Sequence, residues 1–114
     1  MMHRSTMVAF LSALALLAAT GAVAATRYVS LTGASVPPYT TPENAAQSIQ
    51  DAVDISSDGD TILVLEGTYT PPAQIVVWRA ITIRGLFGPE KTIINSGGAH
   101  RGFFIQNMDA VIEA

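Results

Sequence analysis

Six short runs rich in β-branched and apolar residues follow Asp60, and they constrain the fold more than any other feature of the sequence. They cover residues 61–65, 74–77, 81–84, 92–95, 102–106 and 110–113. Turns containing glycine or proline separate the runs, no helical periodicity returns, and the Asn-Gly or Asp-Gly dipeptides typical of two-residue hairpins are missing between them. This part of the chain is therefore predicted to consist of strands that are not joined by tight hairpins.

The spacing of these runs indicates a repeat. One series of alternate runs is spaced by 19 and 22 residues, and the other by 18 and 18. Two interleaved series with a period near 20 residues are typical of a solenoid, in which each coil adds one strand to each of several parallel sheets. The predicted inward ladders are Ile62, Ile81 and Phe103 or Phe104 on one face, and Ile75, Ile93 and Val111 on another. On spacing alone, a β-sandwich with evenly spaced turns stays open as the alternative.

A helix is predicted ahead of these runs, over residues 41–56. Thr41 suits the capping position, Pro42 the first helical position, and Glu43 the positive end of the helix dipole. Apolar residues then recur every three or four positions, with polar residues on the opposite, solvent side. The apolar set is Ala45, Ala46, Ile49, Ala52 and Val53, and the polar set is Gln47, Ser48, Gln50, Asp51 and Asp54. Upstream, residues 27–31 are predicted as a short strand and residues 32–40 as a proline-containing loop.

Residues 1–25 have the three regions of a secretory signal. Arg4 supplies the positive charge, residues 7–19 form an apolar run, and residues 21–25 are small. The apolar run is shorter than the ~20 residues that cross a bilayer. We therefore expect a cleaved signal peptide, no membrane span after its removal, and a secreted, periplasmic or cell-surface location.

Two cleavage sites are compatible with the small residues at the end of this segment. Cleavage before Thr26 would follow Ala25, with Val23 two positions further upstream. Cleavage before Ala25 would follow Ala24, with Ala22 in the corresponding upstream position. The sequence leaves both sites open.

Several motifs together resemble the N-terminal start of right-handed parallel β-helix proteins of the pectate-lyase-like kind. They are the helical segment 44–54, the turn Gly59-Asp60-Thr61 with the apolar run after it, and Gly67-Thr68-Tyr69. Residues 81–85, followed by residues 92–94, are similar to the next strand and turn of that family. The resemblance extends from residue 28 to about residue 94. It implies an all-β fold, a right-handed parallel β-helix (solenoid) with an N-terminal capping helix and the first two to three coils.

The signal segment and this resemblance together predict a domain organisation. Residues 1–25 are the signal peptide, residues 26–60 the N-terminal strand, Pro-rich loop and capping helix, and residues 61–114 the first coils. Solenoids need about three or more repeats for stability, and residues 61–114 give fewer at this period. We expect a truncated part of a longer protein, poorly soluble alone, with an apolar strand edge. The residues expected on or beside that edge are Phe103, Phe104, Ile105, Val111 and Ile112.

Charge and composition exclude several classes of function. Six Lys and Arg residues against nine Asp and Glu residues give a net charge of −3, and no stretch groups even three basic residues. Phosphate neutralisation needs such clusters, so no nucleic-acid partner is expected. The chain has no cysteine, which excludes disulfides, a thiol nucleophile and a Cys-based zinc site.

Few residues are candidates for chemistry. His100 is the one histidine after the signal segment and could act as a base or metal ligand, but it lacks nearby partners. Asp58 and Asp60 give too few oxygens for a Ca²⁺ site. Glycoside hydrolysis needs two carboxyl groups that face one cleft, and nothing in the sequence places two of Asp51, Asp54 and Glu66 in this way. Residues 85–91 lack phosphate-loop spacing. Tyr69 and the Trp78-Arg79 pair could form an exposed aromatic strip for sugar stacking, or pack at a coil edge. We assign no catalytic, metal or cofactor-binding residue and expect no cofactor.

Two classes of function stay open at this point. The first is a cell-surface or secreted β-helix with a glycan-binding, protein-binding or structural role, its partners being polysaccharides or surface glycans bound by coils that follow. The alternative is the N-terminal part of a pectate-lyase-like polysaccharide lyase or hydrolase. The family resemblance implies that an active site of that kind would lie on middle coils, beyond residue 114.

Overall fold

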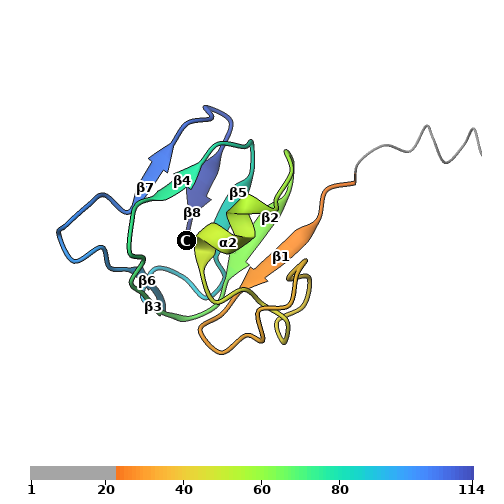
Figure 1. Ribbon diagram of the computed structural model, residues 1–114, viewed down its shortest axis with the longest axis horizontal. Helices are drawn as coiled ribbons and strands as arrows, with labels where there is room; N and C mark the ends of the chain where they lie inside the picture. Colours follow the sequence, from red (N-terminus) through yellow and green to blue (C-terminus); the bar gives the residue numbers. More distant parts are fainter. Residues whose placement is uncertain (1–22) are drawn as a thin grey trace, which may run out of the picture.

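The computed structural model describes residues 23–114, which form short β-strands and one helix (Figure 1). The strands are β1 Thr26–Val29, β2 Thr61–Val64, β3 Gly67–Tyr69, β4 Ile75–Val77, β5 Thr82–Gly85, β6 Thr92–Ile94, β7 Phe103–Ile105 and β8 Val111–Glu113, and the helix is α2 Ile49–Asp54. Most of the predicted signal segment lies outside the described residues.

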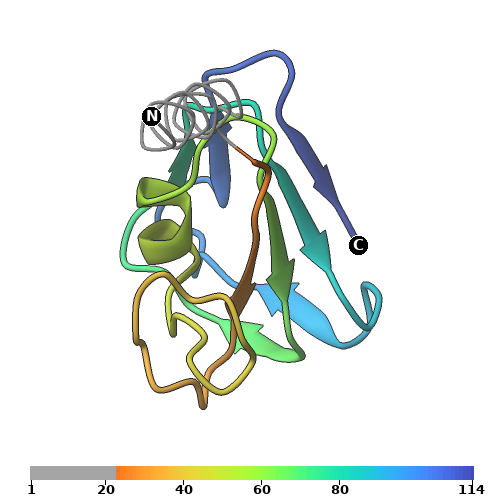
Figure 2. The same ribbon diagram turned by 90° about the vertical axis from the view of Figure 1, so that its right-hand side faces the viewer.

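All strand pairs between these elements are parallel. One sheet has the order β1-β2-β5-β8, a second pairs β3 with β6, and a third pairs β4 with β7. The chain passes through the three sheets in turn as β2, β3 and β4, then repeats this order as β5, β6 and β7, and returns to the first sheet with β8 (Figures 1 and 2). Parallel strands cannot be joined by tight hairpins, so the predicted absence of such hairpins is confirmed.

Buried and half-exposed residues alternate along the strands, and this alternation shows which face each strand turns inward. Ile62 and Val64 of β2 are buried while their neighbours are half-exposed, and Ile75 and Val77 of β4 follow the same pattern. Burial of a side chain of this size contributes about 1.5–3 kcal/mol. The buried residues of all three sheets meet in one apolar cluster, which includes Ile49, Ala52 and Val53 of α2.

The predicted inward ladders are wrong in most of their pairings. Ile62 lies beside Ile83, not Ile81, and Ile83 lies beside Ile112. Ile75 pairs with Phe103. Ile93 and Val111, predicted to point inward, are 46% and 44% exposed.

Unequal spacing explains these errors. Ile62 and Ile83 are 21 residues apart, whereas Ile83 and Ile112 are 29 apart. A uniform period of about 20 residues therefore assigns the wrong partners. The strand β3 is not predicted from the sequence either, because it begins with glycine and has no run of apolar residues.

The helix is shorter than predicted. Ser48 is its N-cap and accepts a hydrogen bond from the backbone N–H of Asp51. Residues 41–48 form turns and a single bridge, because Ala46 pairs with β1: its N–H donates to Tyr28 O, and its carbonyl accepts from Ser30 N. Thr41 caps only a local turn, where its hydroxyl oxygen accepts from the N–H of Asn44. Pairing with β1 thus overrides the helical pattern before Ser48.

The two ends of the strand stack differ. At the β1 end, α2 and the loop over residues 31–48 cover the core, with the N–H of Tyr28 donating to Tyr39 O. At the other end β6, β7 and β8 are each the last strand of their sheet within the described residues. Figure 2 shows α2 on the side of β1 and the chain end at β8 on the opposite side.

We predict that Ile83→Ala lowers the free energy of unfolding by about 2–5 kcal/mol, because it leaves a cavity between Ile62 and Ile112. Ile93→Ala removes the same atoms from an exposed position on β6 and should change stability by less than about 0.5 kcal/mol. Denaturant unfolding monitored by circular dichroism measures both values. Equal losses would contradict the register given above.

Candidate functional site

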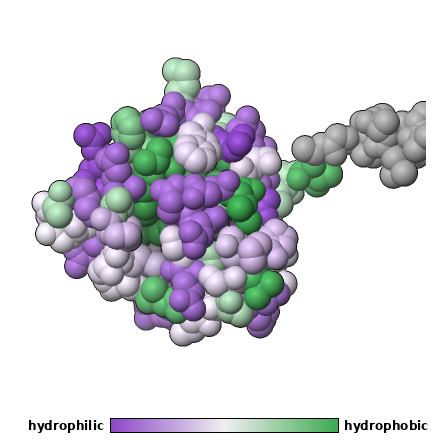
Figure 3. All heavy atoms as spheres, in the orientation of Figure 1, coloured by the Kyte–Doolittle hydropathy of each residue, from purple (hydrophilic) through white to green (hydrophobic). Residues whose placement is uncertain are grey.

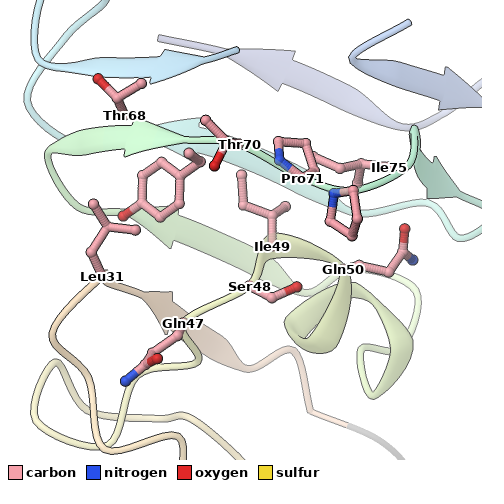
Figure 4. Close-up of a pocket in the computed structure, with 11 residues that line it drawn as sticks. Leu31, Gln47, Ser48, Ile49, Gln50, Thr68, Thr70, Pro71 and Ile75 are labelled. Atoms are coloured by element: carbon pink, nitrogen blue, oxygen red, sulfur yellow. The ribbon is translucent and has the colours of Figure 1, made fainter. Parts of the chain in front are cut away.

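A cavity of about 190 Å³ lies between the start of α2 and the strand β3 (Figure 4). Its walls are Leu31, Gln47, Ser48, Ile49, Gln50, Thr68, Tyr69, Thr70, Pro71, Pro72 and Ile75. In Figure 4, Ile49, Thr70 and Pro71 converge on the space between the helix and the strand. The helix therefore supplies one wall and the segment after β3 the other.

Hydrogen bonds within the protein fix most of the polar side chains around this cavity. Gln47 donates through Nε2 to Gly33 O at 2.7 Å. The Tyr69 hydroxyl is buried and donates to Leu65 O at 2.8 Å, and burial raises the pKa of this phenol above its ordinary value. The cavity is thus preformed, because its polar groups are held in place without a ligand.

Gln50 has a structural role that its position in the helical pattern does not indicate. Its Oε1 accepts from the N–H of Val76 at 2.8 Å, and its Nε2 donates to Val76 O at 3.1 Å. The amide of one side chain thereby satisfies the edge of β4 that faces away from β7, as a neighbouring strand would. The prediction that Gln50 faces solvent is wrong, since it joins α2 to the third sheet.

The cavity suits a small neutral group better than a reaction. None of its lining residues is charged, and the one titratable side chain among them, the Tyr69 phenol, is buried and donates to Leu65 O. Its volume lies below the ~300–1,000 Å³ typical of small-molecule sites. Hydroxyl and amide groups next to proline and leucine can hold a sugar hydroxyl, and within residues 23–114 no hydrogen bond joins any of these hydroxyls to a base that would activate it as a nucleophile.

A second cavity, of about 230 Å³, opens at the end of the stack near β8. Its apolar walls are residues of the strand interiors, namely Val64, Ile83, Ile94, Phe103 and Ile112. Phe103 and Ile94 are only partly buried and pack against the core cluster. Ile49 of α2 also lines this cavity, which lies against the apolar core.

Asp60 is the most deeply buried charged residue described, with 1% of its surface exposed. Its Oδ2 accepts from Arg27 Nη2 at 3.1 Å and from Ser57 N at 2.9 Å, and its Oδ1 accepts from Ala25 N at 2.8 Å. The same guanidinium donates through Nη1 to Pro38 O. Burial alone would raise the pKa of this carboxyl, but the N–H donors of Ser57 and Ala25, together with Arg27, bring the pKa below its ordinary value.

Sequence reasoning missed this cluster, although one signal for it was present. Asp60 directly precedes β2, and Arg27 lies in β1, which pairs with β2 in the register Thr26 to Thr61. Had the pairing of these two strands been known, the ion pair would have followed from it. From the sequence, Asp60 is assigned only to the turn before β2, whereas in the structure its oxygens are bonded to N–H donors of this chain.

The other candidate side chains are spread over the surface. His100 is half-buried in a loop, with Nδ1 2.9 Å from Arg101 O. Asp58 accepts from Ala80 N through Oδ1, and Asp54 accepts from Gln50 Nε2. Glu66 is exposed beside β3. Within residues 23–114 no group of three or more His, Cys, Asp or Glu side chains is placed to hold a metal ion.

The structure separates the aromatic residues considered for sugar stacking. Tyr69 is 4% exposed and belongs to the core, whereas Trp78 is 46% exposed just after β4. An exposed strip that includes both is therefore excluded. On the face shown in Figure 3, polar residues cover the centre and apolar residues form small patches around them.

The chain matches no known family model, no curated protein and no solved structure. Its described part, residues 23–114, contains no helix with the length and apolar character needed to span a membrane.

We predict that Gln50→Ala lowers the free energy of unfolding by about 1–3 kcal/mol, because it leaves both backbone groups of Val76 without partners on a half-buried edge. Gln106→Ala, at an exposed position after β7, is the matched control and should be nearly neutral. Hydrogen exchange of the Val76 amide should accelerate only in Gln50→Ala. An unchanged exchange rate would contradict the role given to Gln50.

Asp60→Asn should lower stability at neutral pH by about 3–5 kcal/mol, since it leaves Arg27 without its buried partner. The folded-state pKa of Asp60 lies below the unfolded value, so the carboxylate stabilises the protein above the unfolded pKa. This contribution is lost as the pH falls through the folded pKa. Melting temperatures of the two proteins should therefore converge toward acidic pH, and Asp109→Asn, at an exposed loop position, should follow the wild type throughout.

Proposed function

We propose that residues 26–114 form the capped N-terminal start of a right-handed parallel β-helix in an exported protein. The observation that carries this proposal is the repeated order of strands. Two successive passes of the chain visit the same three sheets in the same order, and each strand of the second pass pairs in parallel with its counterpart in the first. Coils that stack on one another in this way are the repeating unit of a β-helix.

The right-handed sense follows from a general rule of chain topology. About 98% of crossover connections between parallel strands of one sheet are right-handed. The connection from β2 to β5 and the connection from β5 to β8 are both of this type. The family resemblance of the motifs in residues 44–69 and 81–94 supports the same assignment.

The difference between the two ends of the stack supports a continuing β-helix. Terminal repeats of solenoids need a cap, and α2 with the loop over residues 31–48 provides one at the β1 end. At the other end β8 carries Val111 and Ile112 with 44% and 36% exposure. We propose that a further coil, from residues that follow in a longer polypeptide, covers this end.

The proposed role of the complete protein is binding or structural, at the cell surface or outside the cell. Two observations support this role. Asp60 and Arg27 form an ion pair within the fold, and no charged residue lines the cavity between α2 and β3. The partners would be polysaccharides, surface glycans or proteins that contact the long faces of following coils. The alternative is a polysaccharide lyase or hydrolase whose active site lies on coils beyond residue 114.

Export is proposed from residues 1–25 alone, on the charge, apolar run and small residues described above. The experiment that tests location is fractionation of the source cells with an antibody against residues 26–114. Detection outside the cytoplasmic membrane, at the mass of a processed chain, is expected. Unprocessed protein in the cytoplasm would overturn the proposal.

The role is tested by offering the exported protein a panel of acidic and neutral polysaccharides. We expect the 114-residue chain, after removal of its signal peptide, to release no unsaturated uronate and no reducing ends from any of them. Retention of the complete protein on one polysaccharide without product formation would support the binding role. Turnover by the complete protein alone would favour the lyase or hydrolase. Turnover by the processed 114-residue chain would contradict the expectation that it holds no catalytic site.

We further expect the chain that ends at Ala114 to associate through its open strand edges, which are templates for pairing with another chain. Val111→Lys places a charge on the last strand of the first sheet and should raise the monomer fraction in size-exclusion chromatography. Val36→Lys adds the same charge at a residue of similar exposure in the capping loop and should leave association unchanged. A monomeric wild type, or equal effects of both variants, would contradict an open edge at β8.

A further inference from the structure

We propose that export leaves Ala25 as the first residue of the mature protein and that its α-ammonium group pairs with the buried carboxylate of Asp60. Of the two cleavage sites that the sequence leaves open, this selects the bond between Ala24 and Ala25. The inference rests on the proposed export, and it assigns a processing site and a structural role for the new chain end.

Ala25 is joined to the fold on both of its backbone groups. Its nitrogen lies 2.8 Å from Asp60 Oδ1, and its carbonyl oxygen accepts from the N–H of Thr61 at 2.9 Å. Both partners sit at the start of β2, directly beside β1. Ala25 thus extends the pairing of β1 with β2 by one residue.

The residues just upstream have no comparable place in the structure. Ala24 is exposed, and Val23 is 82% exposed. The ordered backbone contacts with Asp60 and Thr61 therefore begin at Ala25. Ala22 and Ala24 supply the small residues that a signal peptidase needs for a cut at this point.

The two cleavage sites have opposite consequences for Asp60. A cut before Thr26 removes Ala25, and with it the donor to Oδ1 and the acceptor of the Thr61 N–H. A cut before Ala25 keeps both contacts and converts a neutral amide N–H into an ammonium group. The bond to the Asp60 carboxylate is already charge-assisted with an amide donor, and an ammonium donor adds the attraction of an opposite charge.

The charges around the carboxylate accommodate this change. Arg27 occupies Oδ2, so Oδ1 is the oxygen that faces the new ammonium. The other charged side chain in the same turn is Asp58, which is exposed and accepts from Ala80 N. Asp58 therefore adds a second negative charge to the turn that contains Asp60.

The cleavage site is tested by expressing the full 114-residue chain in a secreting host and determining the N-terminus by sequencing and intact mass. We expect Ala25. A mature chain that begins at Thr26 would overturn this inference and leave the proposed export intact. A chain that keeps residues 1–24 after secretion, or is not secreted, would overturn the export proposal itself.

The ion pair is tested on the same secreted protein by reductive methylation. The mature chain has two amines, the α-amine and the side chain of Lys91, which is the only lysine in the sequence and is exposed. At neutral pH we expect the α-amine of the wild type to react about tenfold more slowly relative to Lys91 than it does in Asp60→Asn, because the carboxylate holds it in the ammonium form. An equal ratio of rates in the two proteins would overturn the pairing.

A second measurement keeps the test decisive if Asp60→Asn does not fold. The wild type is labelled in buffer and again in concentrated urea, with Lys91 as the internal reference in both. We expect the relative rate of the α-amine to rise by a similar factor on unfolding. An unchanged ratio would show that the folded protein does not hold the chain end and would contradict the proposal.

Discussion

Parallel pairing of very short strands is the constraint on which this structure depends. The strands have three or four residues each, too few to form a stable sheet by local interactions. Their stability comes from stacking, because each pass of the chain lays its strands beside those of the previous pass and adds inward residues to a shared core. Ile62 beside Ile83 and Ile75 beside Phe103 are the contacts through which one pass stabilises the next.

A stack of this kind must be closed at its ends, and the described residues close one of them. Gln50 provides β4 with the two hydrogen bonds that a further strand would otherwise make. The helix covers the core with Ile49, Ala52 and Val53, while Ala46 pairs with β1. The cap therefore supplies both apolar cover and backbone partners, which are the two requirements of an exposed sheet edge.

Most of the charged and polar side chains that suggested chemistry have structural partners instead. Asp60 binds Arg27 and two backbone N–H groups, and Asp58 binds the backbone of Ala80. Arg84 pairs with Glu113 across β5 and β8, at exposed positions where such a pair contributes about 0–1 kcal/mol. These side chains stabilise the fold, which agrees with the proposed binding or structural role. The proposed mature chain end would give Asp60 a second cationic partner besides Arg27.

The sequence alone determined the local features that depend on residue type and near neighbours. Short runs rich in β-branched and apolar residues identified β2 and β4 to β8, and glycine- and proline-containing turns separated them, because backbone preference acts over a few positions. The apolar face of Ile49, Ala52 and Val53 was also correctly predicted.

Only the tertiary structure decided which strands lie side by side and where the cap begins. Loop lengths between strands vary, so a fixed period misplaced Ile93 and Val111, and pairing of Ala46 with β1 shortened the helix despite the favourable residues at 41–43. Gln50 binds Val76, which lies 26 positions later in the sequence. Arg27 binds Asp60, which lies 33 positions later. These contacts depend on which strands lie side by side and on how α2 packs against β4, and the spacing of residues along the chain gives neither.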